Sequence, residues 1–396
     1  MPRAPRALAA ALGIPLERII KLDANEGVHG LPPAAQRALA DFATGGIASG
    51  RYPDPAAYDL RDALATYTGA DAAGIVVGNG SEEVVQLLAG EVLRPDDEII
   101  ICEPTFGLYA LVARRAGATV VSVALDDAFA VRVDAVLEAL TPRTRAVFVC
   151  APNNPTGTAV AAGVLEALAG RVPLLVVDEA YHEFAMLSNA PLTGPEADPD
   201  KPWVAGRSGA AEMVARGQSV VVLRTLSKAF GMAGLRVGYA LCAPDLARRM
   251  RARKAPFNVN AAGQVAAVAA LGEVTWMLEH VAETVGERER LAGGLATILD
   301  FRVHPSVTNF LLVDWEAAGT EGSLPLYRGL QRRGILVRRS DDPRLAACLR
   351  ITVGTAAEND AVVRALHELV GGDDGSGARL APEEHGMTRP GTSVRE

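Results

Sequence analysis

The chain has 396 residues, of which 49% are hydrophobic and 22% are charged, a balance typical of globular proteins. This length suffices for two domains, or for one large α/β unit with a smaller lobe. The formal net charge of −8 excludes a general binder of nucleic acid or of anionic lipid. Any anion that the protein binds must therefore be held by a local site.

The four cysteines are widely separated in the chain and show no CxxC spacing. We therefore expect neither a disulfide framework nor a metal site, and a reducing cytoplasm fits this cysteine usage best. The residues are Cys102, Cys150, Cys242 and Cys348.

The N-terminal stretch 2–16 carries two arginines and an Ala/Leu run, so it faintly resembles a signal peptide. Glu17 and Arg18 interrupt the pattern, and we interpret the stretch as an amphipathic first helix. No segment reaches the roughly 18 uninterrupted apolar residues of a spanning helix, so the sequence predicts no membrane segment.

From about Gly74 to Ala243, short Val- and Ile-rich runs alternate with helix-length segments such as 82–93, 109–116 and 161–169. Continuous apolar runs of this length are typical of strands that are buried on both faces. Strand–helix alternation predicts a mostly parallel sheet with helices on both faces. The runs are GIVVGNG, EIIICEP, TVVSVAL, AVFVCAPN, LLVVDEAY, SVVVLRTLS and RVGYALC.

The last third of the chain has a different pattern. A helical pattern with few breakers runs from Pro244 to about Leu299, and a smaller unit follows. The segment 189–211 is long for a connection, so we expect a surface insertion there. Within the smaller unit we expect strands near 309–314, 335–338 and 349–352, a helix over 360–370, and a disordered tail over 371–396.

Polar residues follow several of the predicted strands. Gly80, Ser81 and Glu82 open a helix, whose N-terminal amides form either an anion site or only a capped turn. Asn154 stands in the turn PNNPTG, where it either directs its amide at a ligand or only shapes the turn. Because ligands bind at the carboxyl ends of parallel strands, these residues are candidates for a site.

Two further candidates are charged. Asp178 closes a buried strand, so its carboxylate needs a salt bridge, a helix cap or a cationic ligand to offset desolvation. The residues after it, His182 and Glu183, are expected at the surface. Lys228 lies among Ala, Gly, Phe and Met, where burial lowers the pKa of an amine and makes it nucleophilic.

Around this lysine, Thr225, Ser227 and Arg236 supply two hydroxyls and a guanidinium, which suit a phosphate monoester. Pyridoxal phosphate needs hydrogen-bond donors for its phosphate, a buried carboxylate, a polar amide and a reactive lysine. The sequence offers all four. In enzymes that use this cofactor, a lysine of the protein forms the Schiff base with it, and a carboxylate of the protein keeps its pyridine nitrogen protonated.

With these motifs in this order, the chain resembles the fold-type I pyridoxal-phosphate aminotransferases, and among them the histidinol-phosphate aminotransferases. The resemblance extends from about Lys21 to Val370. It rests on RYPDP (51–55), GNGSEEV (78–84), PTFGLY (104–109), PNNPTG (152–157), VVDEAYHEF (176–184), RTLSKAFGMAGLRVGYA (224–240), PSVTNFLL (305–312), GILVR (334–338) and CLRITVGT (348–355).

The resemblance implies a large domain with a mostly parallel seven-stranded sheet between helices, and a small α+β domain built from both ends of the chain. Residues 1–50 are then an N-terminal segment that joins the small domain, and 51–255 form the cofactor-binding domain. Residues 256–370 comprise a long helix and the C-terminal small domain, ahead of the tail.

The resemblance also implies roles for the residues that contact the cofactor. Lys228 is the lysine of the internal aldimine and moves the proton between Cα and C4′, and Asp178 pairs with the pyridine nitrogen. Tyr181 and Asn154 bond the phenolic oxygen, and Phe106 stacks on the ring where the family usually has Tyr. The phosphate is assigned to Thr225, Ser227, Arg236 and the amides of Gly80, Ser81 and Glu82.

Further implied roles concern the substrate and a partner subunit. Tyr52 resembles the tyrosine that reaches the cofactor phosphate of the neighbouring subunit, which implies a homodimer with shared sites. Arg350 is expected to bind the substrate carboxylate bidentately, although a strand arginine in a surface ion pair is the alternative. Arg338 is assigned to the same region or to a substrate phosphate, and Asn25 and His29 are also candidates for substrate contacts.

One motif departs from the family pattern, which has approximately N-E-N-P-Y-G where this chain has Asn25-Glu26-Gly27-Val28-His29-Gly30. The implied function is ping-pong transamination of L-histidinol phosphate with 2-oxoglutarate, in histidine biosynthesis, without nucleic acid, membrane or metal. The departure leaves open an aminotransferase for aromatic or specialised amino acids, and a decarboxylase of an amino-acid phosphate is a further alternative. A ligand sensor fused to a DNA-binding domain is disfavoured by the acidic charge and the short N-terminus.

Overall fold

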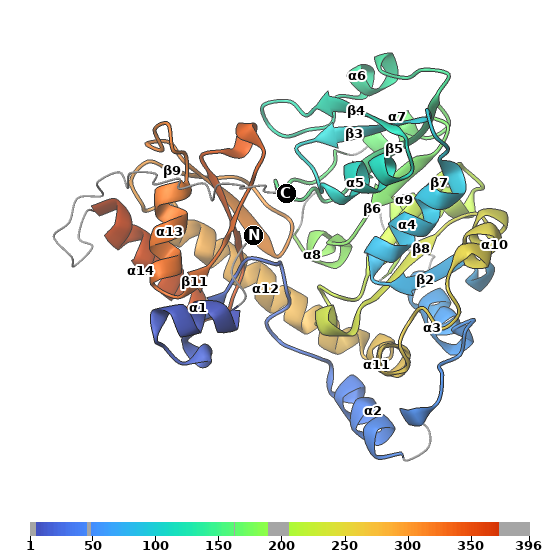
Figure 1. Ribbon diagram of the computed structural model, residues 1–396, viewed down its shortest axis with the longest axis horizontal. Coiled ribbons are helices and arrows are strands. Elements are labelled where there is room, and N and C mark those ends of the chain that lie inside the picture. Colours follow the sequence, from blue (N-terminus) through green and yellow to red (C-terminus); the bar gives the residue numbers. More distant parts are fainter. Residues whose placement is uncertain (1–4, 46–48, 162, 189–205, 372–396) are drawn as a thin grey trace, which may run out of the picture.

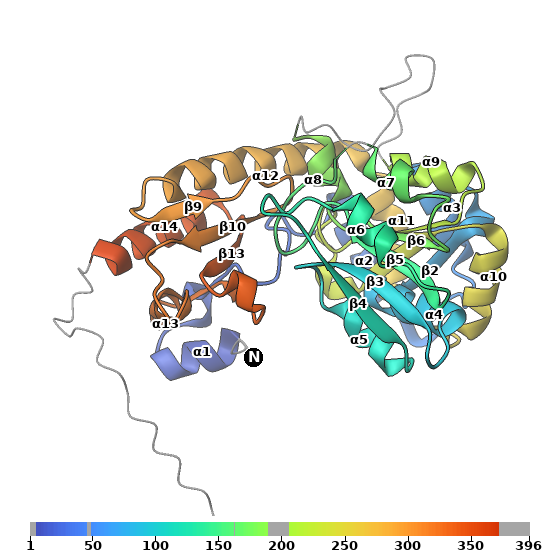
Figure 2. The ribbon, with the colours of Figure 1, turned by 90° about the horizontal axis from the view of Figure 1, so that it is seen from above.

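The computed structural model describes residues 5–45, 49–161, 163–188 and 206–371. Figures 1 and 2 show a large lobe around a seven-stranded sheet and a smaller lobe around a four-stranded sheet, with the helix α12 (Val274–Leu295) running between them. The N-terminal segment passes from the small lobe to the large one, where α2 (Pro33–Thr44) packs on α11 (Ala261–Leu271).

Each of the seven apolar runs forms one strand of the central sheet, in the order β2-β8-β7-β6-β5-β3-β4. The pairs are parallel except those of β8, which is antiparallel to both of its neighbours. The prediction of a mostly parallel seven-stranded sheet is therefore confirmed. The strands are β2 (Ile75–Asn79), β3 (Glu98–Glu103), β4 (Thr119–Ala124), β5 (Thr144–Cys150), β6 (Leu175–Asp178), β7 (Val220–Thr225) and β8 (Val237–Leu241).

The sheet is buried on both faces, which explains the continuous apolar runs. Along β6, Leu175 and Val177 belong to the core on one face, and Val176 belongs to the core on the other. On the first face lie α3 (Tyr58–Thr68), α7 (Val164–Leu168), α9 (Gly209–Ala215) and α11. On the second face lie α4 (Ser81–Val92), α5 (Leu108–Arg115) and α10 (Pro244–Arg253).

The small lobe has its own core, which combines residues from both ends of the chain. Its antiparallel sheet has the order β12-β13-β10-β9, and a separate parallel pair joins β1 to β11. The elements are β1 (Ile20–Lys21), β9 (Phe301–Val303), β10 (Phe310–Trp315), β11 (Ile335–Leu336), β12 (Arg338–Arg339) and β13 (Cys348–Thr352), with α1 (Pro5–Leu12), α13 (Leu324–Arg332) and α14 (Ala356–Gly371). The short helices α6 (Val133–Glu138) and α8 (His182–Met186) belong to the large lobe.

The long helical pattern after Pro244 is divided into three helices, α10, α11 and α12. The first break follows Lys254, and α11 begins anew where the Asn260 side chain accepts a hydrogen bond from the amide of Gly263. The second break lies at Gly272, and α11 and α12 are bent by 86° there. The capping residue Asn260 and Gly272 each interrupt the helix locally. The spacing of apolar residues does not reveal such an interruption.

Other boundaries also differ from the sequence prediction. The C-terminal helix begins at Ala356 rather than Asp360, and the strand expected near 335–338 is divided into β11 and β12. The strands β1 and β9, which were not predicted, have only two or three residues. Of the expected insertion, residues 189–205 lie outside the described residues, whereas Ser208 caps α9. The expected tail lies outside the described residues beyond Gly371.

The expectation that His182 and Glu183 lie at the surface is wrong, because both are buried. Glu183 accepts a hydrogen bond of 3.0 Å from Oη of Tyr67 and lies 4.0 Å from Arg224. Arg224 is 1% exposed and donates from Nε to Glu179 at 2.8 Å. The buried guanidinium on β7 therefore explains the buried carboxylates, since charges inside a protein need partners.

Among the described residues, no single helix is long and apolar enough to cross a membrane, and only the bent pair α11 and α12 meets those criteria when taken together.

Candidate active site

A cavity of about 890 Å³ lies at the carboxyl ends of β5, β6 and β7 and is closed on the other side by the N-terminal segment and by β12 and β13. This edge of the sheet is where parallel α/β proteins bind their ligands. Most of the residues predicted from the sequence line it. They are Asn25, Ser81, Glu82, Phe106, Asn154, Asp178, Tyr181, Thr225, Ser227, Lys228, Arg236, Arg338 and Arg350.

Lys228 lies in the turn that follows β7, and its Nζ donates a hydrogen bond of 3.0 Å to the carbonyl of Ala24. Burial, and secondarily the charge of Arg350, lower the pKa of the lysine from 10.5 to about 8. The amine is therefore more available as a nucleophile near neutral pH than an ordinary lysine is.

Asp178 ends β6 and is 5% exposed. Its Oδ2 accepts a hydrogen bond of 2.6 Å from Oη of Tyr109, and its Oδ1 accepts one of 3.1 Å from the amide of Ala180. Burial raises the pKa of this carboxyl group, and the hydrogen bond from Tyr109 opposes that shift. Within the described part of the chain Asp178 has no ion pair, so a cationic group in the cavity would favour the carboxylate form.

Tyr181 links the large lobe to the N-terminal segment. Its Oη accepts a hydrogen bond of 2.8 Å from Nδ2 of Asn25, and burial raises its pKa to about 12. The amide of Asn25 in turn donates to Oγ1 of Thr352 on β13 at 2.9 Å, and its carbonyl accepts from Nδ2 of Asn309 at 3.1 Å. These bonds hold the N-terminal segment at the border between the two lobes.

One end of the cavity has the donors that a phosphate group requires. The helix α4 begins at Ser81, and Gly80 precedes it with a φ of +81°. A Cβ at Gly80 would lie 2.5 Å from Nη2 of Arg236, so glycine allows that guanidinium to approach the helix N-terminus. Oγ1 of Thr225 donates to Oγ of Ser227 at 2.8 Å in the adjacent turn. Helix amides, hydroxyls and a guanidinium together form an anion site.

Arg350, on β13, enters the cavity from the small lobe. Its Nη1 donates to Oδ1 of Asn154 at 2.7 Å, and its Nη2 donates to the carbonyl of Asp23 at 2.8 Å. Its Nε is buried and has no hydrogen-bond partner among the described residues. Arg338 stands opposite Arg350 across the β12–β13 pair. In the part of the chain that the structure describes, neither guanidinium group forms an ion pair with a carboxylate, so the two favour an anionic ligand.

The structure places Tyr52 and His29 outside the large cavity, although His29 lines a small separate pocket together with Lys228. Tyr52 is 81% exposed, and its ring stacks on Phe257 with 4.4 Å between the centroids. The ring of His29 meets that of His280 on α12 at 4.5 Å between the centroids. Neither residue lines the large cavity.

Sequence reasoning missed Tyr109, Thr352 and Asn309, which bond Asp178 and Asn25 directly. All three stand inside motifs that were recognised as a whole (PTFGLY, CLRITVGT and PSVTNFLL). These three residues could have been found from the sequence as polar residues within otherwise apolar segments, because a buried polar residue needs a hydrogen-bond partner.

The donor set fits pyridoxal phosphate. The cofactor's aldehyde, pyridine nitrogen and phosphate require an amine, a carboxylate and an anion site, and the chain provides Lys228, Asp178 and the residues around the start of α4 in one cavity. Phe106 supplies an aromatic side chain to the same cavity, and Tyr181 and Asn154 supply polar groups to it.

Comparisons with known proteins agree with this geometry. Residues 17–366 match the family model of class I and II aminotransferases. A histidinol-phosphate aminotransferase of Roseiflexus castenholzii is 41% identical over 91% of this chain and 92% of the relative. One of Granulibacter bethesdensis is 39% identical over 90% of each chain.

Solved structures show the same fold. A histidinol-phosphate aminotransferase from Sinorhizobium meliloti in complex with pyridoxal-5′-phosphate superposes with a TM-score of 0.79 at 26% identity, covering 94% of this chain and 96% of that one. An aspartate aminotransferase double mutant from Thermus thermophilus gives 0.73 at 25% identity, covering 93% and 97%. The chain therefore belongs to the family of class I and II aminotransferases, and it is an enzyme of the transaminase type.

Proposed function

We propose that the protein uses pyridoxal phosphate to transfer the amino group of L-histidinol phosphate to 2-oxoglutarate, which yields imidazole acetol phosphate and L-glutamate. The relatives named histidinol-phosphate aminotransferase, at 41% and 39% identity over about nine-tenths of the chain, support this substrate. Run in reverse, with glutamate as the amino donor and histidinol phosphate as the product, the reaction would make the protein a participant in histidine biosynthesis.

The observation that carries the proposal is the position of Arg350 and Arg338 on facing strands at the substrate side of the cavity. Both substrates carry an anion beside the reacting carbon, a phosphate ester in histidinol phosphate and a carboxylate in glutamate. A ping-pong enzyme binds the two in turn at the same place, so the same guanidinium groups must bind either anion. The buried Nε of Arg350, which has no partner among the described residues, is available for this contact.

When bound, pyridoxal phosphate supplies an electron sink for the charge that develops at the substrate α-carbon. Lys228 would hold the cofactor aldehyde through Nζ, and its lowered pKa of about 8 would suit it to move the substrate α-proton. Asp178 would orient the cofactor and hold the proton on its pyridine nitrogen. Tyr181 and Asn154 would bond the phenolic oxygen, and Phe106 would provide a face for the ring.

The phosphate of the cofactor is assigned to the anion site at the start of α4. Thr225, Ser227 and Arg236 offer their side chains, and Ser81 and Glu82 offer the amides of the first helical turn. A phosphate held there would lie close to Lys228, which follows Ser227 directly in the chain.

We further propose that two chains form a homodimer in which Tyr52 of one protomer reaches the cofactor phosphate in the other. The stacked pair of Tyr52 and Phe257, exposed by 81% and 38%, supports this proposal, because two large aromatic side chains in water are a typical mark of an interface. The four free, buried cysteines support a reducing compartment, for which we propose the cytoplasm.

Two other substrate classes fit the same cofactor site. His29 in place of the family tyrosine favours a different amino acid, such as an aromatic one, and an amino-acid phosphate decarboxylase would also need cationic side chains. Single half-reactions distinguish these two alternatives from the proposed histidinol-phosphate activity. The purified protein, loaded with pyridoxal phosphate, is mixed in separate runs with histidinol phosphate, phenylalanine, glutamate and threonine phosphate, and the cofactor absorbance is followed.

We expect histidinol phosphate and glutamate to convert the cofactor to its pyridoxamine form, and Lys228→Ala to lose this conversion. Failure of histidinol phosphate to do so would contradict the proposed substrate while leaving the transaminase class intact. Release of carbon dioxide from threonine phosphate would instead identify a decarboxylase.

A further inference from the structure

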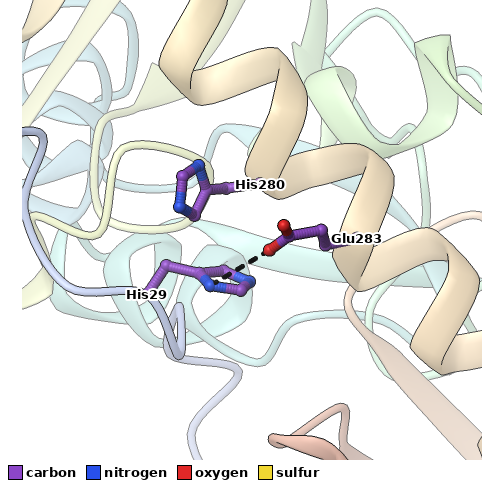
Figure 3. A group of neighbouring side chains, drawn as sticks. All are labelled: His29, His280 and Glu283. Carbon is purple, nitrogen blue, oxygen red and sulfur yellow. Dashed lines mark ion pairs between the residues drawn. The ribbon is translucent and has the colours of Figure 1, made fainter.

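A second cluster of chemically active side chains lies outside the cavity, where the N-terminal segment crosses α12. His29 belongs to the segment between β1 and α2, and His280 and Glu283 follow one another by one turn on α12. One donor atom from each residue, a ring nitrogen or a carboxylate oxygen, lies within 4.8 Å of the other two. Figure 3 shows the three side chains converging from the two elements. We name them the His–His–Glu cluster.

The ring of His280 is held in the state that a metal ion needs. Its Nδ1 lies 2.7 Å from the carbonyl of Trp276, one turn earlier on α12. A carbonyl only accepts, so Nδ1 carries the proton and the lone pair of the neutral ring is on Nε2. The ring of Trp276 stacks on it with 3.9 Å between the centroids, which fixes its orientation. A backbone carbonyl that binds the second ring nitrogen is the usual arrangement for a histidine that ligates a metal.

His29 faces the same point from the other side. Its Nδ1 lies 3.6 Å from Oε2 of Glu283, which is longer than a hydrogen bond. The ring of His29 meets that of His280 edge to face, with 4.5 Å between the centroids, so the two imidazoles lie side by side at the cluster. The carboxylate of Glu283 is 62% exposed, which leaves water free to complete a coordination shell.

Two imidazoles and one carboxylate are donors for zinc and for the other late first-row divalent ions, and they are poor donors for magnesium or calcium. Ligands at about 2.0–2.2 Å from a tetrahedral zinc lie roughly 3.3–3.5 Å apart. In the cluster, Nδ1 of His29 lies 3.6 Å from Oε2 of Glu283, and all three donor atoms lie within 4.8 Å of one another. Rotation of the exposed Glu283 side chain would bring its carboxylate closer to the two rings.

The position of His29 gives such an ion a consequence for the active site. Four and five residues before it, Asn25 bonds Tyr181 and Ala24 accepts the hydrogen bond of Lys228. The same segment packs on the turn that carries the lysine, since a Cβ at Gly27 would lie 2.8 Å from the carbonyl of Lys228. Whatever ties His29 to α12 therefore also restrains the backbone against Lys228.

We propose that His29, His280 and Glu283 bind one divalent transition-metal ion of the zinc class, and that this ion links the N-terminal segment to α12. Nothing in the spacing of the sequence indicates the site, because His29 and the two residues on α12 are far apart along the chain. The ion acts as a structural clip beside the active site and takes no part in the transfer of the amino group.

The test uses the full chain without an affinity tag, loaded with pyridoxal phosphate and freed of metal by a chelator. Zinc chloride is titrated in a calorimeter, and cobalt(II) is added separately as a spectroscopic probe. We expect one equivalent of zinc to bind, and cobalt(II) to develop visible absorption bands of a site with nitrogen ligands. His280→Ala and Glu283→Gln should each weaken zinc binding at least tenfold. His367→Ala, which removes an exposed histidine on α14, is the matched control and should leave the affinity unchanged.

Hydrogen–deuterium exchange tests whether the bound ion restrains the N-terminal segment. Zinc should slow exchange of the amides in residues 22–30 of the wild-type protein and leave those of His280→Ala unaffected. Cofactor absorbance and circular dichroism show whether each variant is folded. No zinc binding by the wild type, or equal affinity in His280→Ala, Glu283→Gln and the control, would overturn the proposal. Zinc bound only by the cofactor would also overturn it, and would appear as binding that all variants share.

Discussion

The phenolic hydroxyl of Tyr109 donates a hydrogen bond of 2.6 Å to Oδ2 of Asp178, and both residues are buried. Tyr109 lies on α5 and Asp178 ends β6. The bond opposes the rise in the pKa of Asp178 that burial causes. Tyr109 thus helps to keep the carboxylate in the form that pairs with a protonated heterocycle.

Replacing Tyr109 with Phe should therefore weaken both the fold and the cofactor site. A buried carboxylate oxygen that loses its donor costs about 1–3 kcal/mol, so the free energy of unfolding should fall by that amount. The pKa of Asp178 should rise further, and the dissociation constant of pyridoxal phosphate should increase. Denaturant unfolding and cofactor titration measure the two effects.

The matched control for this variant is Tyr67→Phe. Tyr67 also donates to a buried carboxylate, that of Glu183, at 3.0 Å, but it does not line the cavity. The free energy of unfolding of the Tyr67→Phe variant should fall by a similar amount, and its affinity for the cofactor should not change. Equal cofactor affinity in both variants would show that Tyr109 serves the fold alone.

Cofactor capture should depend on pH with a midpoint near the pKa of Lys228, which is lowered from 10.5 to about 8. Because only the neutral amine attacks an aldehyde, the capture rate should rise as pH increases and level off above about 8. At pH 7 about a tenth of the molecules then hold the neutral amine, far more than for an ordinary lysine. The measurement is the rate of absorbance change after pyridoxal phosphate is added to cofactor-free protein.

Arg350 provides the control for this pH profile. Its charge lowers the pKa of Lys228, so Arg350→Gln should move the midpoint to higher pH. An unchanged midpoint would mean that burial alone sets the pKa of the lysine.

Arg350→Lys should affect substrate binding more than turnover. A lysine keeps the charge but loses the planar fork that binds a carboxylate or phosphate through two parallel hydrogen bonds. Hydrogen bonds to charged groups contribute about 1.5–3 kcal/mol, so KM should rise roughly tenfold to a hundredfold for both the amino donor and the oxo acceptor. Steady-state kinetics with each substrate varied in turn give the values. A change confined to kcat would place Arg350 outside the substrate contact.

Mixed dimers test whether Tyr52 acts on the neighbouring subunit. Tyr52→Phe and Lys228→Ala should each have low activity alone. In a hybrid of the two, the subunit that keeps Lys228 faces the intact Tyr52 of its partner, so activity should return to about half that of the wild type. If Tyr52 instead serves its own subunit, or if the protein is a monomer, the mixture will stay as inactive as its components.

Much of the fold was predictable because its signals are local. The apolar runs predicted all seven central strands, since a strand buried on both faces must be apolar at each position. The helix breaks at Lys254 and Gly272 were not predicted, because a capping side chain and one glycine leave the apolar period almost intact.

The candidate site divides in the same way. Lys228, Asp178 and the Gly80–Glu82 turn are each marked by their immediate neighbours in the chain, so the sequence alone determined the fold class and the main chemistry. Which polar groups meet was decided by the tertiary structure. The order of the strands and the crossing of the N-terminal segment over α12 pair Tyr109 with Asp178, and His29 with His280. Such contacts join residues that are distant in the chain and arise only when the elements pack. The spacing of apolar residues along the sequence therefore cannot predict them.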